Sequence, residues 1–150
     1  MKAKKVPVVV IDSDAIVAQA NKDDSNHQKA LKVTQRLASL GSKDIYPVTA
    51  VCEAVTVLSK KLSSKKAAWG IASVFAEPQI EVVEVNKDIY ARALNNYFDP
   101  KASKKNTIFD CIVATVADEY GADAIFSFDK FYKKRGFKLA SELYPKTNSS

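Results

Sequence analysis

The segment 106–131, NTIFDCIVATVADEYGADAIFSFDKF, constrains the fold more than any other part of the chain. Its first half carries apolar residues at helical spacing, behind Asn106 or Thr107 as a polar residue that can cap a helix. Gly121 favours a left-handed helix end, and the short apolar run 124–126 is typical of a buried strand. A helix, a glycine turn and a strand in this order predict an α/β arrangement.

The rest of the chain continues this alternation. The run VVVI at 8–11 is β-branched throughout, as is typical of a central parallel strand, and shorter strands are expected over 44–48, 80–85 and 137–139. Helical spacing predicts helices over 15–20, 30–40, 50–62 (capped by Thr49), 65–75 and 86–97. We therefore expect one α/β domain over 1–150 with a mostly parallel sheet, and flexible ends at about 1–6 and 145–150.

Charge and hydropathy limit the classes of partner. The 150 residues carry a formal net charge of +6, with lysines concentrated in KAKK, KKLSSKK, PKASKK and KFYKKRGFK. This pattern favours a polyanion such as nucleic acid as partner, although lysine-rich segments are also typical of plain solvated surface. No apolar run is long enough to cross a membrane and no signal peptide is recognisable, so we expect no membrane partner and a cytoplasmic location.

Several kinds of catalytic site are not expected. Cys52 and Cys111 lack the spacing and the histidine partners of a zinc site, and we predict that both are small buried hydrophobic residues. The single histidine, His27, falls in a polar loop, which disfavours histidine catalysis. The four glycines are not clustered, so no glycine-rich phosphate loop is present.

Four acids stand at positions where the expected strands end or the expected helices begin. Asp12 and Asp129 follow strands, whereas Glu53 and Asp110 fall in the first turns of helices. The carboxyl ends of parallel strands form one edge, where ligands of α/β sheets bind. Carboxylates gathered there repel one another unless a cation neutralises them, and oxygen ligands without thiol or imidazole favour Mg²⁺ or Mn²⁺. Such a site suits phosphodiester cleavage by a metal-activated water. The helix dipole alone also favours acids such as Glu53 in a first turn.

The order of four motifs resembles a known family. IDSD after the first strand, TAVCE at a helix start, FDCIVATVA in a later helix and FSFDKF at a strand end are similar to the PIN domain. The most similar group is the VapC-type toxin ribonucleases of toxin–antitoxin pairs. The resemblance covers nearly the whole chain, is most specific over 110–131, and implies a three-layer α/β/α domain.

The resemblance also implies residue roles. The catalytic and metal-binding acidic quartet of the family corresponds to Asp12, Glu53, Asp110 and Asp129. Supporting positions are Ser127, which by resemblance orients a carboxylate, Thr49 at a helix start, and Asp14. Asp14 stands where the family more often has Asn, Ser or Thr, so it either borders the site as a fifth acid or caps the first helix. The implied protein is a Mg²⁺- or Mn²⁺-dependent endoribonuclease toxin, a homodimer, with an RNA substrate and a small antitoxin that covers the cleft. The residues that contact RNA are not predicted.

Two other functions remain open from the sequence. In a haloacid-dehalogenase-like phosphatase, Asp12 would be the nucleophile and Asp14 the general acid. That family expects a second acidic motif late in the chain, where Asp129 stands alone. The other alternative is a non-catalytic RNA-binding module of PIN-like fold, which the complete set of four acids disfavours.

Overall fold

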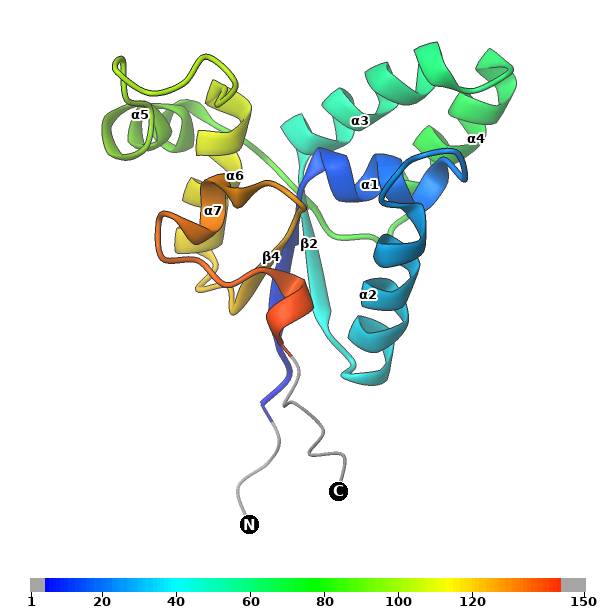
Figure 1. Cartoon of the computed structure of the whole chain (residues 1–150), viewed down its shortest axis with the longest axis horizontal. Helices are drawn as coiled ribbons and strands as arrows, with labels where there is room; N and C mark the ends of the chain where they lie inside the picture. The colour runs from blue at the N-terminus through cyan, green and yellow to red at the C-terminus, as the bar shows by residue number, and fades with distance from the viewer. Residues whose placement is uncertain (1–4, 144–150) are drawn as a thin grey trace.

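The computed structural model describes residues 5–143, and most of the predicted flexible ends, 1–4 and 144–150, lie outside the described residues. Its centre is a sheet of four parallel strands in the order β3-β2-β1-β4 (Figure 1). The strands are β1 (Val8–Ile11), β2 (Lys43–Pro47), β3 (Val82–Val83) and β4 (Ala124–Phe126). The prediction of a mostly parallel sheet is confirmed, with the β-branched run of β1 at its buried centre.

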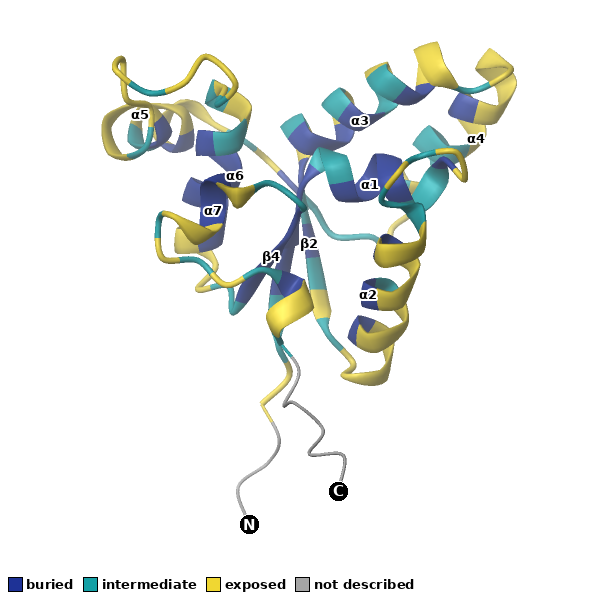
Figure 2. Ribbon diagram, in the orientation of Figure 1, coloured by how far each residue is buried: buried dark blue, intermediate teal, exposed yellow. Residues whose placement is uncertain are grey.

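Helices cover both faces of this sheet, which confirms the three-layer α/β/α architecture (Figures 1 and 2). One core cluster joins the sheet to α1 (Ser13–Ala20), α2 (His27–Ser39) and α3 (Val48–Lys61), and α4 (Lys65–Val74) packs on α3. The other cluster joins the sheet to α5 (Lys87–Asn96), α6 (Ile108–Glu119) and the short α7 (Lys130–Lys133). A 3₁₀ helix, η1 (Ala140–Glu142), follows the last bridge of the sheet.

Two of the predicted strands differ from the structure, one in its length and the other in its existence. Over 80–85 only Val82–Val83 pairs, because β3 is an edge strand whose partner ends at Pro47, which has no N–H to donate and leads directly into α3. Over 137–139 the prediction is wrong: a single bridge joins Leu139 to Ile125, and η1 begins at the next residue.

The helix, turn and strand predicted over 106–131 are confirmed. Helix α6 has seven consecutive buried residues, Cys111 to Ala117, because it lies between the sheet and α5. Gly121 follows it with φ of 57°, a left-handed conformation that favours glycine. Cys111 is buried as predicted, but Cys52 is exposed on α3, so the prediction for that cysteine is wrong.

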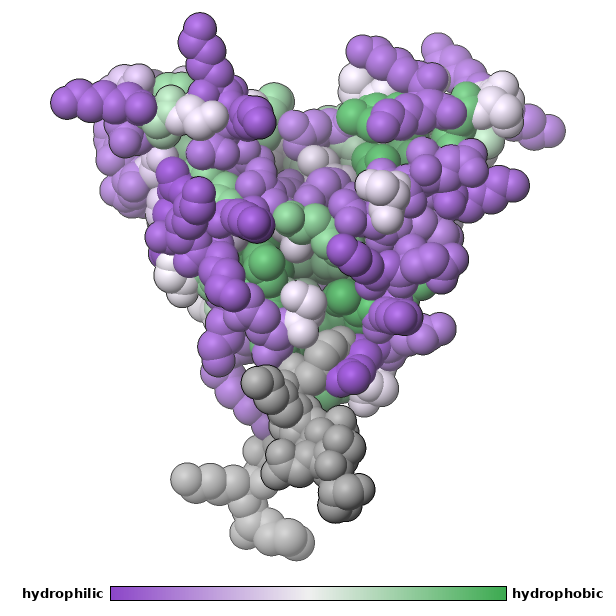
Figure 3. All heavy atoms as spheres, viewed as in Figure 1, coloured by the Kyte–Doolittle hydropathy of each residue, from purple (hydrophilic) through white to green (hydrophobic). Residues whose placement is uncertain are grey.

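The helices extend beyond the sheet on either side of its carboxyl edge and form two arms. One arm is the α3–α4 pair, and the other is α5 with the 97–107 loop and the start of α6 (Figure 1). The space-filling view shows a notch between the arms, with hydrophilic residues on both (Figure 3). The strands β1 and β4 run toward this notch, whereas the start of β1 and the helix η1 lie toward the opposite end of the molecule (Figure 1). Side chains that follow β1 and β4 are therefore placed at the base of the notch.

Candidate functional site

Asp12 is held at the end of β1 by three hydrogen bonds. Its amide donates to the carbonyl of Phe126 on β4 (3.0 Å), which places it at the junction of the two strands. Its Oδ1 accepts from the amide of Ser13 (2.7 Å) and so caps α1, and its Oδ2 accepts from the hydroxyl of Tyr132 (2.6 Å). The residue is only 4% exposed. Burial, and next the charge of Asp14, raise the pKa of Asp12 to about 8.

Asp14 and Ser127 connect α1 to the segment after β4. Asp14 Oδ2 accepts from the Ser127 hydroxyl (2.9 Å) and from the amide of Phe128 (2.8 Å). Ser127 Oγ in turn accepts from the amide of Asp129 (3.0 Å). Burial raises the pKa of Asp14, whose other oxygen, Oδ1, is buried without a hydrogen-bond partner among the described residues. Asp14 lies in the first turn of α1 and does not cap this helix, because the cap is Asp12.

Asp129 and Asp110 lie at the starts of α7 and α6. Asp129 is the cap of α7, and its Oδ1 accepts from the amide of Phe131 (2.9 Å). Asp110 lies in the first turn of α6, and its Oδ2 accepts from the amide of Thr107 (3.0 Å). The pKa of Asp110 is raised to about 6, first by burial and then by the negative charges of Asp129, Glu53 and Asp14.

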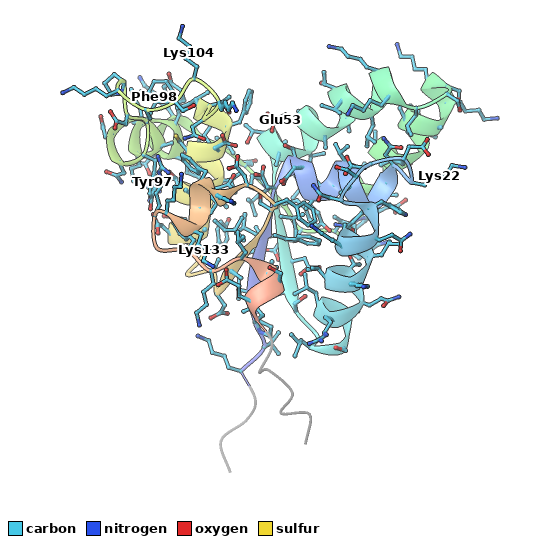
Figure 4. The ribbon with its side chains drawn as sticks, in the orientation of Figure 1. Lys22, Glu53, Tyr97, Phe98, Lys104 and Lys133 are labelled. Atoms are coloured by element: carbon cyan, nitrogen blue, oxygen red, sulfur yellow. The ribbon has the colours of Figure 1, made fainter. Side chains whose placement is uncertain are left out.

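The start of α3 differs from the prediction. The helix begins at Val48, directly after Pro47, whose φ of −59° already suits a helix start. Thr49 therefore does not cap the helix; it lies in the first turn, and its Oγ1 is buried with no partner in the described chain. Glu53 consequently lies in the second turn rather than the first. Its side chain is half-buried at the mouth of the notch (Figure 4).

Glu53 and Asp14 also line a cavity of about 240 Å³ with Asp24. Asp24 belongs to the 21–26 loop, which lies against α1 and α3 and brings its side chain to this cavity. Tyr132 is a second residue near the site that the sequence does not reveal. No local pattern indicates that its hydroxyl reaches Asp12, 120 positions away.

The acids influence one another electrostatically but do not form a closed ligand shell. Asp110 is affected by Asp129, Glu53 and Asp14, and Asp12 by Asp14 and Asp110, so all five acids belong to one edge of the sheet. Within residues 5–143, no group of three acidic, histidine or cysteine side chains is arranged to hold a metal ion. The oxygens of Asp12, Asp110 and Asp129 instead accept hydrogen bonds from within the chain.

The chemistry of these residues fits a hard divalent cation. The donors are carboxylate oxygens, without thiol or imidazole, and this donor set suits Mg²⁺ or Mn²⁺. Asp14 Oδ1 is buried without a partner among the described residues. Burial, and after it the charges of neighbouring acids, raise the pKa values of Asp12 and Asp110, and a bound cation favours the charged form of both carboxyls. The donor set therefore fits such an ion, although the described side chains are not arranged around one.

Comparison with known families identifies the domain. The family model of the PIN domain matches residues 9–138. The chain belongs to the PIN domain family. No significant match was found among curated protein sequences.

Two solved structures share the PIN fold at low sequence identity. The toxin VapC20 from Mycobacterium tuberculosis, described as cleaving the sarcin–ricin loop, is 18% identical with a TM-score of 0.72, and the match covers 86% of this chain and 95% of that one. A chain of VapBC2 from Rickettsia felis, solved bound to a promoter DNA fragment, is 12% identical with a TM-score of 0.61, and the match covers 88% and 96%. At such identities the likeness concerns the fold.

The comparisons with known proteins do not favour the alternative of a haloacid-dehalogenase-like phosphatase. The family model that matches residues 9–138 is that of the PIN domain. In the described part of the chain, no helix is both long and apolar enough to cross a membrane.

Proposed function

We propose that this PIN domain is a Mg²⁺- or Mn²⁺-dependent endoribonuclease. The observation that carries the proposal is the set of mutually repelling carboxylates at the carboxyl edge of the sheet, within a PIN-family fold. The residues proposed to hold the metal and to act in catalysis are Asp12, Glu53, Asp110 and Asp129. When bound, the metal supplies an activated water and polarises the scissile phosphate.

The remaining residues of the site keep these carboxylates in position. Tyr132 and the amide of Ser13 orient the two oxygens of Asp12. Ser127 links Asp14 to the backbone of Asp129, so that a shift of one acid moves the other. We propose that Asp14 supports the site through Oδ1 and Thr49 through its hydroxyl, two buried oxygens that have no hydrogen-bond partner within residues 5–143.

The two arms of the notch supply positive charge for an RNA backbone. Exposed lysines on the α3–α4 arm are Lys60, Lys61, Lys65 and Lys66, and those on the loop of the other arm are Lys101, Lys104 and Lys105. Lysines that neutralise phosphates release counterions and provide affinity that does not depend on sequence. An RNA strand laid across the notch would contact both groups and pass over the acids at its base.

We further propose that the protein is a cytoplasmic toxin that forms a homodimer and is inhibited by a small antitoxin protein. Support comes from the fold shared with a VapC toxin and with a chain of a VapBC complex. The α4 helix also exposes large apolar side chains, with Trp69 71% and Val74 47% exposed, beside an apolar pocket that Ile71 and Phe75 line. Exposed apolar surface of this kind is typical of a protein interface.

Cleavage of a panel of structured RNAs by the wild type and by Asp110→Asn, each with Mg²⁺, Mn²⁺ or EDTA, tests the proposal. The Asn variant keeps the size of the side chain and removes its charge, so cleavage by the wild type in Mg²⁺ or Mn²⁺ should be lost in the variant and in EDTA. Glu77→Gln is the matched control, because Glu77 is exposed in the turn that follows α4. Cleavage by Asp110→Asn at the wild-type rate would refute the assigned role, and RNA binding without cleavage by either protein would favour the binding-module alternative.

A further inference from the structure

A small pocket lies beside the acids on the arm formed by α5 and the 97–107 loop. Its volume is about 170 Å³. Its lining includes Phe98 and Asn106 of the loop, Cys111 of α6, and Phe131 and Arg135 of the segment after β4. This volume is below the roughly 300–1,000 Å³ of pockets for drug-sized ligands, so the pocket suits one flat ring system.

The walls of the pocket are joined to two of the proposed catalytic acids. Asn106 precedes Thr107, whose amide donates to Asp110 Oδ2 (3.0 Å). The amide of Phe131 donates to Asp129 Oδ1 (2.9 Å). The segments that line the pocket therefore adjoin Asp110 and Asp129, and these contacts place the pocket near the proposed site of cleavage.

The lining groups match the chemistry of an unpaired nucleobase. The Arg135 guanidinium carbon lies 3.6 Å from the centre of the Phe131 ring, and its Nη1 donates to the Phe131 carbonyl (3.0 Å), so this planar cation is held in place. Phe98 is 42% exposed and offers an aromatic face. Unpaired RNA bases stack on aromatic rings and guanidinium planes, and side-chain amides such as that of Asn106 bind their edges.

The charges at the pocket favour a base attached to a backbone over a free anion. Lys104 and Arg135 are cationic, but Asp99 also lines the pocket and partly offsets them. Phe98 and Lys104 lie on the same arm, across the notch from Glu53 on α3, and Lys104 extends outward from its tip (Figure 4). Lys104 is thus placed to meet a phosphate at the rim while the ring system occupies the interior.

We infer that this pocket binds an unpaired nucleobase of the RNA substrate next to the scissile phosphate. The inference rests on the proposed ribonuclease function and makes it more specific. A base that is paired in a double helix cannot enter, so the base that occupies the pocket is one that has left its pair. Phe98 and Arg135 provide the stacking surfaces, and Asn106 recognises the edge of the base.

Binding of fluorescent hexaribonucleotides, measured by anisotropy in EDTA so that no cleavage occurs, tests the inference. The two probes are a hexamer with all its bases and an abasic hexamer with the same sugar–phosphate backbone. Because stacking of one base contributes about 1–3 kcal/mol, the wild type should bind the base-containing probe at least about fivefold more tightly. Phe98→Ala and Arg135→Lys should lose most of this preference and still bind the abasic probe. Tyr120→Ala, which removes an exposed aromatic ring outside the pocket, should keep the preference.

Equal binding of the two probes by the wild type would overturn the inference, as would variants that weaken both probes by the same factor. Failure of the ribonuclease proposal gives a different result. In that case no RNA is cleaved in Mg²⁺ or Mn²⁺, while the preference for the base-containing probe and its loss in Phe98→Ala persist.

Discussion

Removing the charge of Asp12 should stabilise the metal-free protein at high pH. The pKa of Asp12 is raised from 3.8 to about 8, chiefly by burial. The folded state therefore holds this proton more tightly than the unfolded state, and stability falls as the pH rises between these values. Since one pKa unit corresponds to about 1.4 kcal/mol, the charged Asp12 costs the folded protein roughly 5 kcal/mol at pH 8. The cost disappears well below pH 3.8, where the carboxyl is neutral in both states.

Asp12→Asn keeps the shape of this side chain and cannot titrate, so its advantage over the wild type should grow with pH. Thermal unfolding in EDTA from pH 4.5 to pH 8.5 measures the effect. For a domain of this size, roughly 5 kcal/mol corresponds to a rise in melting temperature of about 10–20 °C at pH 8. The two proteins should have nearly equal stability at the acidic end.

Tyr132→Phe provides the opposite control for the same carboxyl. The Tyr132 hydroxyl bond stabilises the charged form of Asp12 and lowers its pKa. Its loss should raise the pKa of Asp12 further, so the stability of this variant should continue to fall above pH 8, where that of the wild type levels off. Parallel pH profiles for wild type and Asp12→Asn would refute the reasoning, because they would mean that Asp12 does not titrate between pH 4 and pH 8.

Three further predictions concern the metal, the hydrogen bonds of the site and the RNA. Saturating Mg²⁺ should raise the melting temperature of the wild type at pH 8, because a cation binds only the folded site, and should raise that of Asp12→Asn less, because this variant lacks one proposed ligand. An equal rise in both proteins would count against metal binding at this residue. Ser127→Ala leaves Asp14 Oδ2 with one donor, so urea unfolding should show a loss of about 1–2 kcal/mol, and single-turnover assays should show slower cleavage; unchanged values would exclude a positioning role. Replacing Lys104 and Lys105 with Gln should weaken RNA binding and reduce the slope of log affinity against log salt by up to about 2, whereas an unchanged slope would place the RNA elsewhere.

The order of strands and helices was predictable because it depends on local patterns. A β-branched run such as Val8–Ile11, or a helix followed by Gly121 and a short apolar strand, carries its own signal within a few residues. The errors occurred where a neighbouring segment decided the outcome. The strand expected over 80–85 is cut short because its partner ends at Pro47, and α3 begins before Thr49 for the same reason. Cys52 is exposed because it lies on the outer face of α3.

The location of the acids followed from the sequence, but their environment did not. Asp12 and Asp129 come after the strands β1 and β4 in the chain. Because parallel strands bring their carboxyl ends to one edge of the sheet, the sequence alone predicts acids at that edge. Their pKa values depend on burial and on groups far away in the chain. Tyr132 reaches Asp12 across 120 positions, and Ser127 reaches Asp14 across 113.

The sequence by itself therefore determined the α/β order, the family resemblance and the acids that follow the strands. Only the tertiary structure decided which hydrogen bonds hold those acids, and that a pocket opens beside Asp110 between the 97–107 loop and Arg135. The physical reason is that strand and helix patterns repeat over a few residues. Hydrogen bonds, burial and charge instead depend on which distant segments the packed core brings together.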